Sequence, residues 1–299
     1  MDRLINRYKV AEHRFSIEAD KDSFLWEVME ECYGPFKVDG NGEDMLFTVE
    51  VKDSIDHDGG MLMYSDHERA QEGFISLDVF KQESGFLFLL TQPGGTEPNG
   101  RLFISDDYSF SEMSLHGSKI EQWLTFNAAV DFCFLLATAC HKTLLTHSSA
   151  IVYEGKAYLF LGKSGTGKST HSRMWLSAIE GSVLMNDDHP VIRVGEDGIP
   201  VAYGSPWSGK THCYKNMSAP LGGIVRISRA PHNRAVRQMP IQAYASLMTS
   251  CSGMTWVKEL ADGKDKALQA VVSRVPCWVM ECLPDEDAAR VCCKAVHGN

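Results

Sequence analysis

One segment constrains the fold of this chain more than any other, the glycine-rich stretch Gly162-Lys163-Ser164-Gly165-Thr166-Gly167-Lys168-Ser169. It matches the pattern GxxxxGK[ST] at every fixed position. The apolar run 157–161 precedes it, and residues 169–179 have the composition of a helix. A buried strand that turns through such a loop into a helix predicts a sheet with helices packed on it, an α/β fold.

The chemistry of this glycine loop (residues 162–169) predicts a site for ATP or a related nucleoside triphosphate with Mg²⁺. Its glycines let backbone N–H groups approach phosphates closely, and the helix that follows adds a partial positive charge. Lys168 is expected at the β and γ phosphates and the Ser169 hydroxyl at Mg²⁺, while Thr170 assists Ser169 or caps the helix. The expected nucleotide-binding residues are Gly162, Lys163, Ser164, Gly165, Thr166, Gly167, Lys168, Ser169 and Thr170.

An acidic pair, Asp187 and Asp188, follows the short apolar strand expected at 183–185. Phosphoryl transfer needs a carboxylate near the metal ion and often a second one that orients or deprotonates the nucleophile. Adjacent strand residues point to opposite faces, so one strand end can serve both purposes. A turn before Pro190 is the structural alternative for the same residues.

The whole chain is expected to form two domains, an acidic mixed α+β domain at 1–117 and the catalytic domain at 118–299, which contains the glycine loop. The first has a helix pattern at 20–32 and strand patterns at 45–51, 73–80, 86–91 and 102–105, with no catalytic motif. It is interpreted as a structural or partner-docking domain. The second opens with a helix at 120–142 and has a hairpin pattern at 191–194 and 199–203.

Charge is divided unevenly along the chain, whose net charge is −10. Residues 1–117 carry 24 acidic and 10 basic side chains, whereas residues 118–299 carry 15 acidic and 19 basic ones. Between 198 and 258 seven Lys or Arg residues occur without an acidic one. This run suits a surface that meets phosphates, or else a solvated basic face. Nucleic acid is a disfavoured partner, because the chain as a whole is acidic and no recognition module is present.

The composition also indicates where in the cell the protein is expected. Nine cysteines occur without a CxxC pair, which indicates reduced thiols and a cytoplasmic protein. The first residues are too polar for a signal peptide. The apolar stretch 128–140 contains Asp131 and falls short of the ~20 residues that a bilayer span needs, so no membrane partner is expected.

Together, His147, the loop GKSGTGKS and the strand that ends in the acidic pair resemble the catalytic domain of HPr kinase/phosphorylase in order and spacing. That domain shares its fold with ATP-dependent phosphoenolpyruvate carboxykinases, so the resemblance implies a P-loop kinase domain of this type over about residues 140–240. The segments 204–210, 220–221 and 224–229 resemble smaller HPr-kinase-like proteins of bacteria.

The resemblance also implies roles for individual residues. His147 would lie near the transferred phosphate, Asp187 would accept the hydroxyl proton, and Asp188 would bind Mg²⁺ with Ser169, although the two aspartates are interchangeable at this stage. Lys210 and Arg229 would contact anions on the acceptor side. The expected catalytic residues are therefore Asp187, His147, Lys168 and Arg229, and the expected metal ligands are Ser169 and Asp188.

The predicted activity is ATP-dependent phosphoryl transfer to an unidentified hydroxyl acceptor, either a serine of a protein or peptide or a small metabolite. Thr170 stands where HPr kinases usually carry Glu, which leaves the acceptor open. The alternatives are a nucleotide-binding regulatory protein without transfer and a phosphoenolpyruvate-carboxykinase-like enzyme. The resembled enzymes form oligomers, so a homo-oligomer is an expectation too.

Overall fold

The computed structural model describes residues 2–40, 44–66, 74–209 and 211–298. The chain divides into two compact units, Met1–Ala137 and Thr138–Asn299. The boundary lies after Ala137 rather than after residue 117, because the helix expected at 120–142 packs its aromatic side chains on the first unit. Within the described residues, no helix is both long and apolar enough to cross a bilayer.

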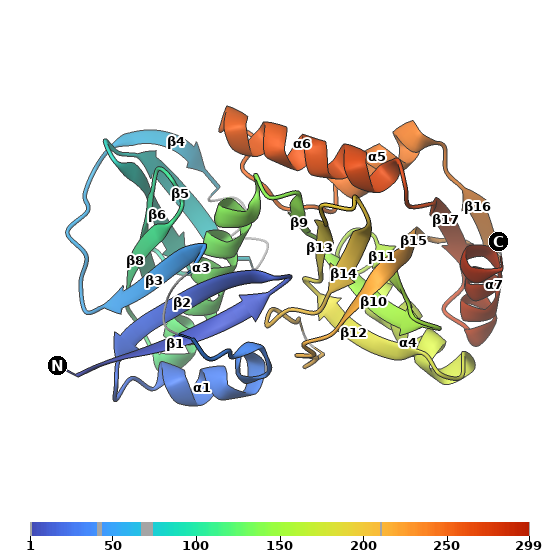
Figure 1. Cartoon of the computed structure of the whole chain (residues 1–299), viewed down its shortest axis with the longest axis horizontal. Helices are drawn as coiled ribbons and strands as arrows, with labels where there is room; N and C mark the ends of the chain where they lie inside the picture. The colour runs from blue at the N-terminus through green and yellow to red at the C-terminus, as the bar shows by residue number, and fades with distance from the viewer. Residues whose placement is uncertain (1, 41–43, 67–73, 210, 299) are drawn as a thin grey trace. The chain divides into compact units, whose positions relative to one another are not determined.

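The first unit is built on one mixed sheet with the strand order β1-β2-β3-β8-β7-β6-β5-β4 (Figure 1). β3 pairs in parallel with β2 and β8, and the other neighbours are antiparallel. The strands are β1 Arg3–Val10, β2 His13–Asp20, β3 Phe47–Lys52, β4 Met61–Ser65, β5 Ser76–Lys81, β6 Gly85–Thr91, β7 Gly100–Ser105 and β8 Phe110–Leu115. The helices are α1 Leu25–Cys32, η1 Gly34–Phe36 and α3 Lys119–Thr138.

Aromatic side chains join α3 to this sheet. Phe15 on β2 stacks on Phe47 on β3 with ring centroids 4.9 Å apart, and Phe134 of α3 meets both rings edge-on. All three are buried. Such pairs contribute beyond their buried area, so this cluster fixes the helix to the first unit.

The expected elements of the first unit are present with shifted ends. The helix pattern at 20–32 forms only from Leu25, because Asp20 still pairs with Arg3 in the β-ladder. The expected strands correspond to β3, β5, β6 and β7, although residue 73 lies outside the described residues. β1, β2, β4 and β8 were missed. On β2 the alternation of buried Phe15, Ile17 and Ala19 was the available signal.

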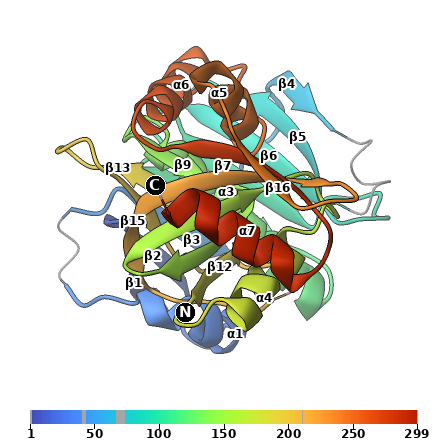
Figure 2. The ribbon, with the colours of Figure 1, turned by 90° about the vertical axis from the view of Figure 1, so that its right-hand side faces the viewer.

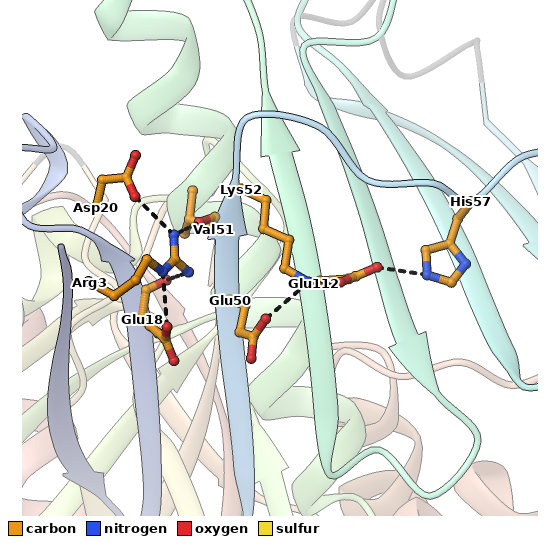
Figure 3. A network of polar contacts seen from close by, with 8 residues as sticks. All are labelled: Arg3, Glu18, Asp20, Glu50, Val51, Lys52, His57 and Glu112. Atoms are coloured by element: carbon orange, nitrogen blue, oxygen red, sulfur yellow. Dashed lines mark hydrogen bonds and ion pairs between the residues drawn. The ribbon is translucent and has the colours of Figure 1, made fainter. Parts of the chain in front are cut away.

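Charged side chains on the first sheet pair across neighbouring strands (Figure 3). Arg3 on β1 bonds to Glu18 and Asp20 on β2. Lys52 lies between two glutamates, Glu50 on its own strand and Glu112 on β8, and the same Glu112 contacts His57 at 2.8 Å. Glu112, the residue shared by two of these contacts, is only 13% exposed, so the network is partly shielded from solvent.

The second unit is built on a mixed sheet that branches at β15. One part has the order β12-β10-β11-β15-β17-β16, and β15 also begins a branch to β14, β13 and β9. β11, β15 and β17 are parallel neighbours. The strands are β9 Thr143–Leu145, β10 Ser148–Tyr153, β11 Lys156–Leu161, β12 Val183–Asp188, β13 Val191–Val194, β14 Pro200–Tyr203, β15 Ser218–Arg229, β16 Arg234–Arg237 and β17 Cys277–Cys282.

Helices cover both faces of this sheet (Figures 1 and 2). They are α4 Lys168–Ala178, α5 Pro240–Met248, α6 Lys258–Val272 and α7 Glu286–His297. On β11, Tyr158 and Phe160 pack with α4 and α7, whereas Leu159 and Leu161 pack with α5 and α6. Successive residues of β11 point to opposite faces of the sheet, and helices cover both faces. The strand is therefore apolar on both sides, which makes it a continuous apolar run. The mixed α/β class is therefore confirmed, as are the hairpin β13–β14 and the helix after the glycine loop.

Candidate functional site

The glycine loop connects β11 to α4 in the second unit. Gly165 and Gly167 have φ values of 75° and 113°, in the region that favours glycine. A Cβ at either position would meet no heavy atom of the described residues within 4 Å. The loop therefore needs these glycines for their backbone conformation and not for space. The N-cap of α4 is Gly167, which supplies no side-chain hydrogen bond, so N–H groups of the first turn are left for a ligand.

Lys168 begins α4 and lies beneath the loop. Its side chain is 9% exposed, and Nζ donates a hydrogen bond to the Gly162 carbonyl at 3.0 Å. Burial lowers the pKa of Lys168, and the carboxylates of Asp188 and Asp187 oppose that effect. The ammonium is thus held between the loop and the acidic pair.

The two aspartates end β12 and face opposite sides of the sheet. Asp187 pairs with Ser149 of β10 in the ladder, and Asp188 pairs with Ser148. The Ser149 hydroxyl lies 2.6 Å from that of Ser172 on α4. Cross-strand partners share a face, so Asp187, which is 6% exposed, is on the α4 side of the sheet.

Ser169 belongs to the same side. It precedes Ser172 by three residues on α4, which puts both on one helix face. Ser169 is exposed. The hydroxyl of Ser169 and the carboxylate of Asp187 are therefore the oxygen donors that α4 and β12 bring to a common face.

Asp188 is part of a second group with two histidines. His147 Nδ1 lies 3.3 Å from Asp188 Oδ1, and one ligand atom each of His147, Asp188 and His189 fall within 4.8 Å of one another. Burial lowers the pKa of His147, and the carboxylate of Asp188 opposes this. Imidazole and carboxylate together are donors that suit a divalent cation, and they also form a base with an orienting partner. Sequence reasoning missed His189, although it follows the acidic pair directly.

Hydrogen bonds hold this end of the sheet in place. The His147 N–H donates to the Ser250 carbonyl at 2.7 Å, just after α5. Asn186 Nδ2 donates to Ser205 and Trp207, which fastens the segment 204–209 to the end of β12. These supports were not predicted. The Asn before the acidic pair was the available signal.

The segment 204–209 lies against the end of β12, beside Asp188. The Gly209 N–H donates to the Asp187 carbonyl at 2.9 Å, and a Cβ on Gly209 would come within 3.2 Å of the Asp188 side chain. Gly209 therefore lets the carboxylate lie against the backbone. Lys210, expected as an anion contact, lies outside the described residues.

Arg229, at the end of β15, contacts the glycine loop itself. Its Nη2 donates to the Gly165 carbonyl and its Nε to the Thr166 carbonyl at 3.4 Å. An acceptor-side anion contact was expected of this residue. In the structure the guanidinium joins the loop to the neighbouring parallel strand, and the anion contact stays a prediction.

Comparisons with known proteins give distant structural matches, one of which is described here. No family model and no curated protein matches the sequence. Among solved structures, the chain is similar to the HPr(Ser) kinase/phosphatase from Coxiella burnetii, at 13% identity and a TM-score of 0.28 over 49% of this chain and 93% of that one. A similarity this distant transfers no activity to the present chain.

Proposed function

We propose that the second unit binds a nucleoside triphosphate at the glycine loop and transfers its terminal phosphoryl group to a hydroxyl acceptor. The observation that carries this proposal is the position of Lys168, a buried ammonium that is bonded to the glycine loop and is influenced by the charge of two carboxylates. On ligand binding the ammonium exchanges its bond to Gly162 for one to a phosphate oxygen. Catalysis then rests on positioning and charge neutralisation.

The strand register favours exchanging the roles first expected of the two aspartates. Ser169 and Asp187 share the α4 face, and a hydroxyl with a carboxylate is a donor set that fits Mg²⁺. Bound there, Mg²⁺ would neutralise negative charge on the phosphate oxygens. His147 and Asp188 lie together on the other side of the strand end.

Asp188 is therefore the proposed base, and His147 positions it. The acceptor hydroxyl gives its proton to an Asp188 oxygen as its own oxygen forms a bond to the γ-phosphorus. The bond between that phosphorus and the β–γ bridging oxygen breaks, and the diphosphate leaves. Arg229 contributes indirectly, because its two bonds to loop carbonyls hold the phosphate-binding backbone against β15.

Calorimetry with ATP and Mg²⁺ tests the binding step, with a matched control inside the loop. Lys168→Ala should weaken ATP binding by roughly ten- to hundredfold, because a charge-assisted bond contributes roughly 1.5–3 kcal/mol and the variant also leaves the acidic pair without its cation. Lys163→Ala removes an exposed side chain of the same loop but keeps the backbone through which this position is expected to meet phosphate, so it should change the affinity less than about threefold. Equal effects of the two substitutions would refute the role of Lys168.

Labelled ATP tests the transfer step. Incubation with HPr-like proteins, serine-containing peptides and free serine should label one acceptor class in the presence of Mg²⁺. Binding without a labelled product across such a panel would favour a nucleotide-responsive regulatory protein instead. Decarboxylation of oxaloacetate with ATP would point to carboxykinase-like chemistry.

A further inference from the structure

A cavity of about 510 Å³ lies beside the glycine loop in the second unit. Its walls come from the first turns of α4, the end of β15 and the end of β17, and two loop residues, Thr166 and Gly167, complete it. Small-molecule pockets usually measure about 300–1,000 Å³. A ligand whose phosphates occupy the loop therefore has its other end beside a cavity large enough for a heteroaromatic ring system.

Most of the wall is hydrocarbon or sulfur. Met174 lies on α4 and Ile227 on β15, Cys282 ends β17, and Leu283 and Pro284 follow that strand. Leu283 is 39% exposed, so part of the apolar surface at this cavity is in contact with solvent. A planar base that covers such surface is favoured by the burial of apolar area, whatever its exocyclic groups.

Several donor groups at the wall already have partners within the protein. The Thr166 hydroxyl donates to the Lys163 carbonyl at 2.7 Å, and the Leu283 N–H donates to Asn233 Oδ1 at 2.9 Å. Arg229, which also lines the cavity, donates to the Gly165 and Thr166 carbonyls. These N–H and O–H groups do not donate to the edge of a base without losing their present bonds. The wall therefore offers a base mainly apolar surface, which does not distinguish one purine from another.

His171 is the histidine of this wall. It is 2% exposed, and Trp175 donates its indole N–H to His171 Nε2 at 3.2 Å, which leaves the ring proton on Nδ1. A ring N–H donor is met equally well by the N7 acceptor of adenine or guanine. A contact of this kind would select for a purine and not between purines.

We infer that this cavity takes the base of the nucleoside triphosphate, chiefly through apolar contact and with little discrimination between adenine and guanine. The inference rests on the proposed function, because it assumes phosphates in the glycine loop. It makes the donor a nucleotide rather than an inorganic polyphosphate, and it separates base recognition from phosphate recognition in the structure.

The test compares ATP, GTP and inorganic tripolyphosphate as ligands in calorimetry with Mg²⁺. Met174→Trp, which fills the cavity from α4, should weaken ATP and GTP at least tenfold and leave tripolyphosphate within twofold. Leu176→Trp is the matched control, since Leu176 lies on the same helix, is 41% exposed and is not part of the wall. It should change none of the three affinities by more than twofold.

A second cavity-filling variant, Ala230→Leu, gives the same comparison should Met174→Trp unfold, and a thermal melt identifies that case. Unchanged ATP affinity in a folded filling variant would overturn the inference, including when phosphoryl transfer falls, because the cavity would then hold the acceptor. A preference above hundredfold for one purine would overturn it as well. Failure of the unmodified protein to bind tripolyphosphate and nucleotides alike refutes the proposed function itself, and the inference falls with it.

Discussion

The buried His171 predicts how the stability of the second unit depends on pH. Burial lowers the pKa of His171 from 6.5 to about 4, and the ring accepts a hydrogen bond from Trp175 while meeting Phe160 edge-on at 4.7 Å. The unfolded chain has the ordinary value, so above pH 6.5 both states are neutral and the group has no effect. Between pH 6.5 and about 4 the unfolded state binds the proton preferentially, and the free energy of unfolding falls as the pH falls.

The magnitude follows from the size of that window. The difference between 6.5 and about 4 is about 2.5 pH units, and each unit corresponds to about 1.4 kcal/mol. Protonation of His171 therefore removes about 3 kcal/mol of stability at the acidic limit, and most of it by pH 4.5. A loss of this size is a large share of the stability of an ordinary domain, about 5–15 kcal/mol.

Urea unfolding of the full chain and of His171→Leu, followed by tryptophan fluorescence at several pH values between 7 and 4.5, measures this effect. At pH 7 the variant should be less stable, because the Trp175 indole N–H loses its acceptor. Relative to the unmodified protein it should then gain about 2–3 kcal/mol by pH 4.5, since it has no imidazole to protonate. Other titrating groups cancel in this comparison. Parallel stability curves for the two proteins would refute a neutral, buried His171.

Three further predictions concern the proposed active site. Asp187→Asn should raise the Mg²⁺ concentration needed for half-maximal activity. Asp188→Asn should lower kcat by about 10²–10⁴-fold and leave the ATP affinity nearly unchanged. The reverse pattern in a Mg²⁺ titration would restore the roles first expected of the two aspartates. Arg229→Gln should weaken ATP binding by roughly tenfold, through a loop that is no longer joined to β15, and calorimetry that shows no change would exclude this contribution. In NMR titrations the pKa of His147 should lie below 6.5, because burial disfavours its charged form, and should fall further in Asp188→Asn, since that carboxylate opposes the effect; a rise in the variant would contradict the pairing.

Local sequence patterns predicted many of the helices and strands. The apolar run of β11, the loop glycines and the helical stretch after them were identified correctly, because strand and helix periodicity and backbone freedom act within a few residues. Strands with clear alternation, such as β6 Gly85–Thr91, were found for the same reason. Element ends were less accurate where pairing overrode propensity, as at Asp20, which belongs to β2 and not to the following helix.

The division of the chain depended on tertiary contacts. The helix α3 has no feature in its own sequence that assigns it to the unit before it or the one after it. Its Phe134 meets Phe15 and Phe47, which are more than eighty residues earlier in the chain. Packing partners this far apart in the sequence come together only in the folded core, so a local sequence pattern does not predict them.

By itself, the sequence determined that a strand, a glycine-rich loop and a helix follow one another, and that two carboxylates end a later strand. Only the tertiary structure decided which carboxylate faces which partner. The register of β12 on β10 puts Asp187 on the α4 side and leaves Asp188 with His147, a residue 41 positions earlier. A register shift by one residue would exchange these faces, and register depends on how the apolar patterns of neighbouring strands match across the sheet, which one strand alone does not reveal. For the same reason the bond from Arg229 to the loop and the cavity at the ends of β15 and β17 appear only once parallel strands are assembled.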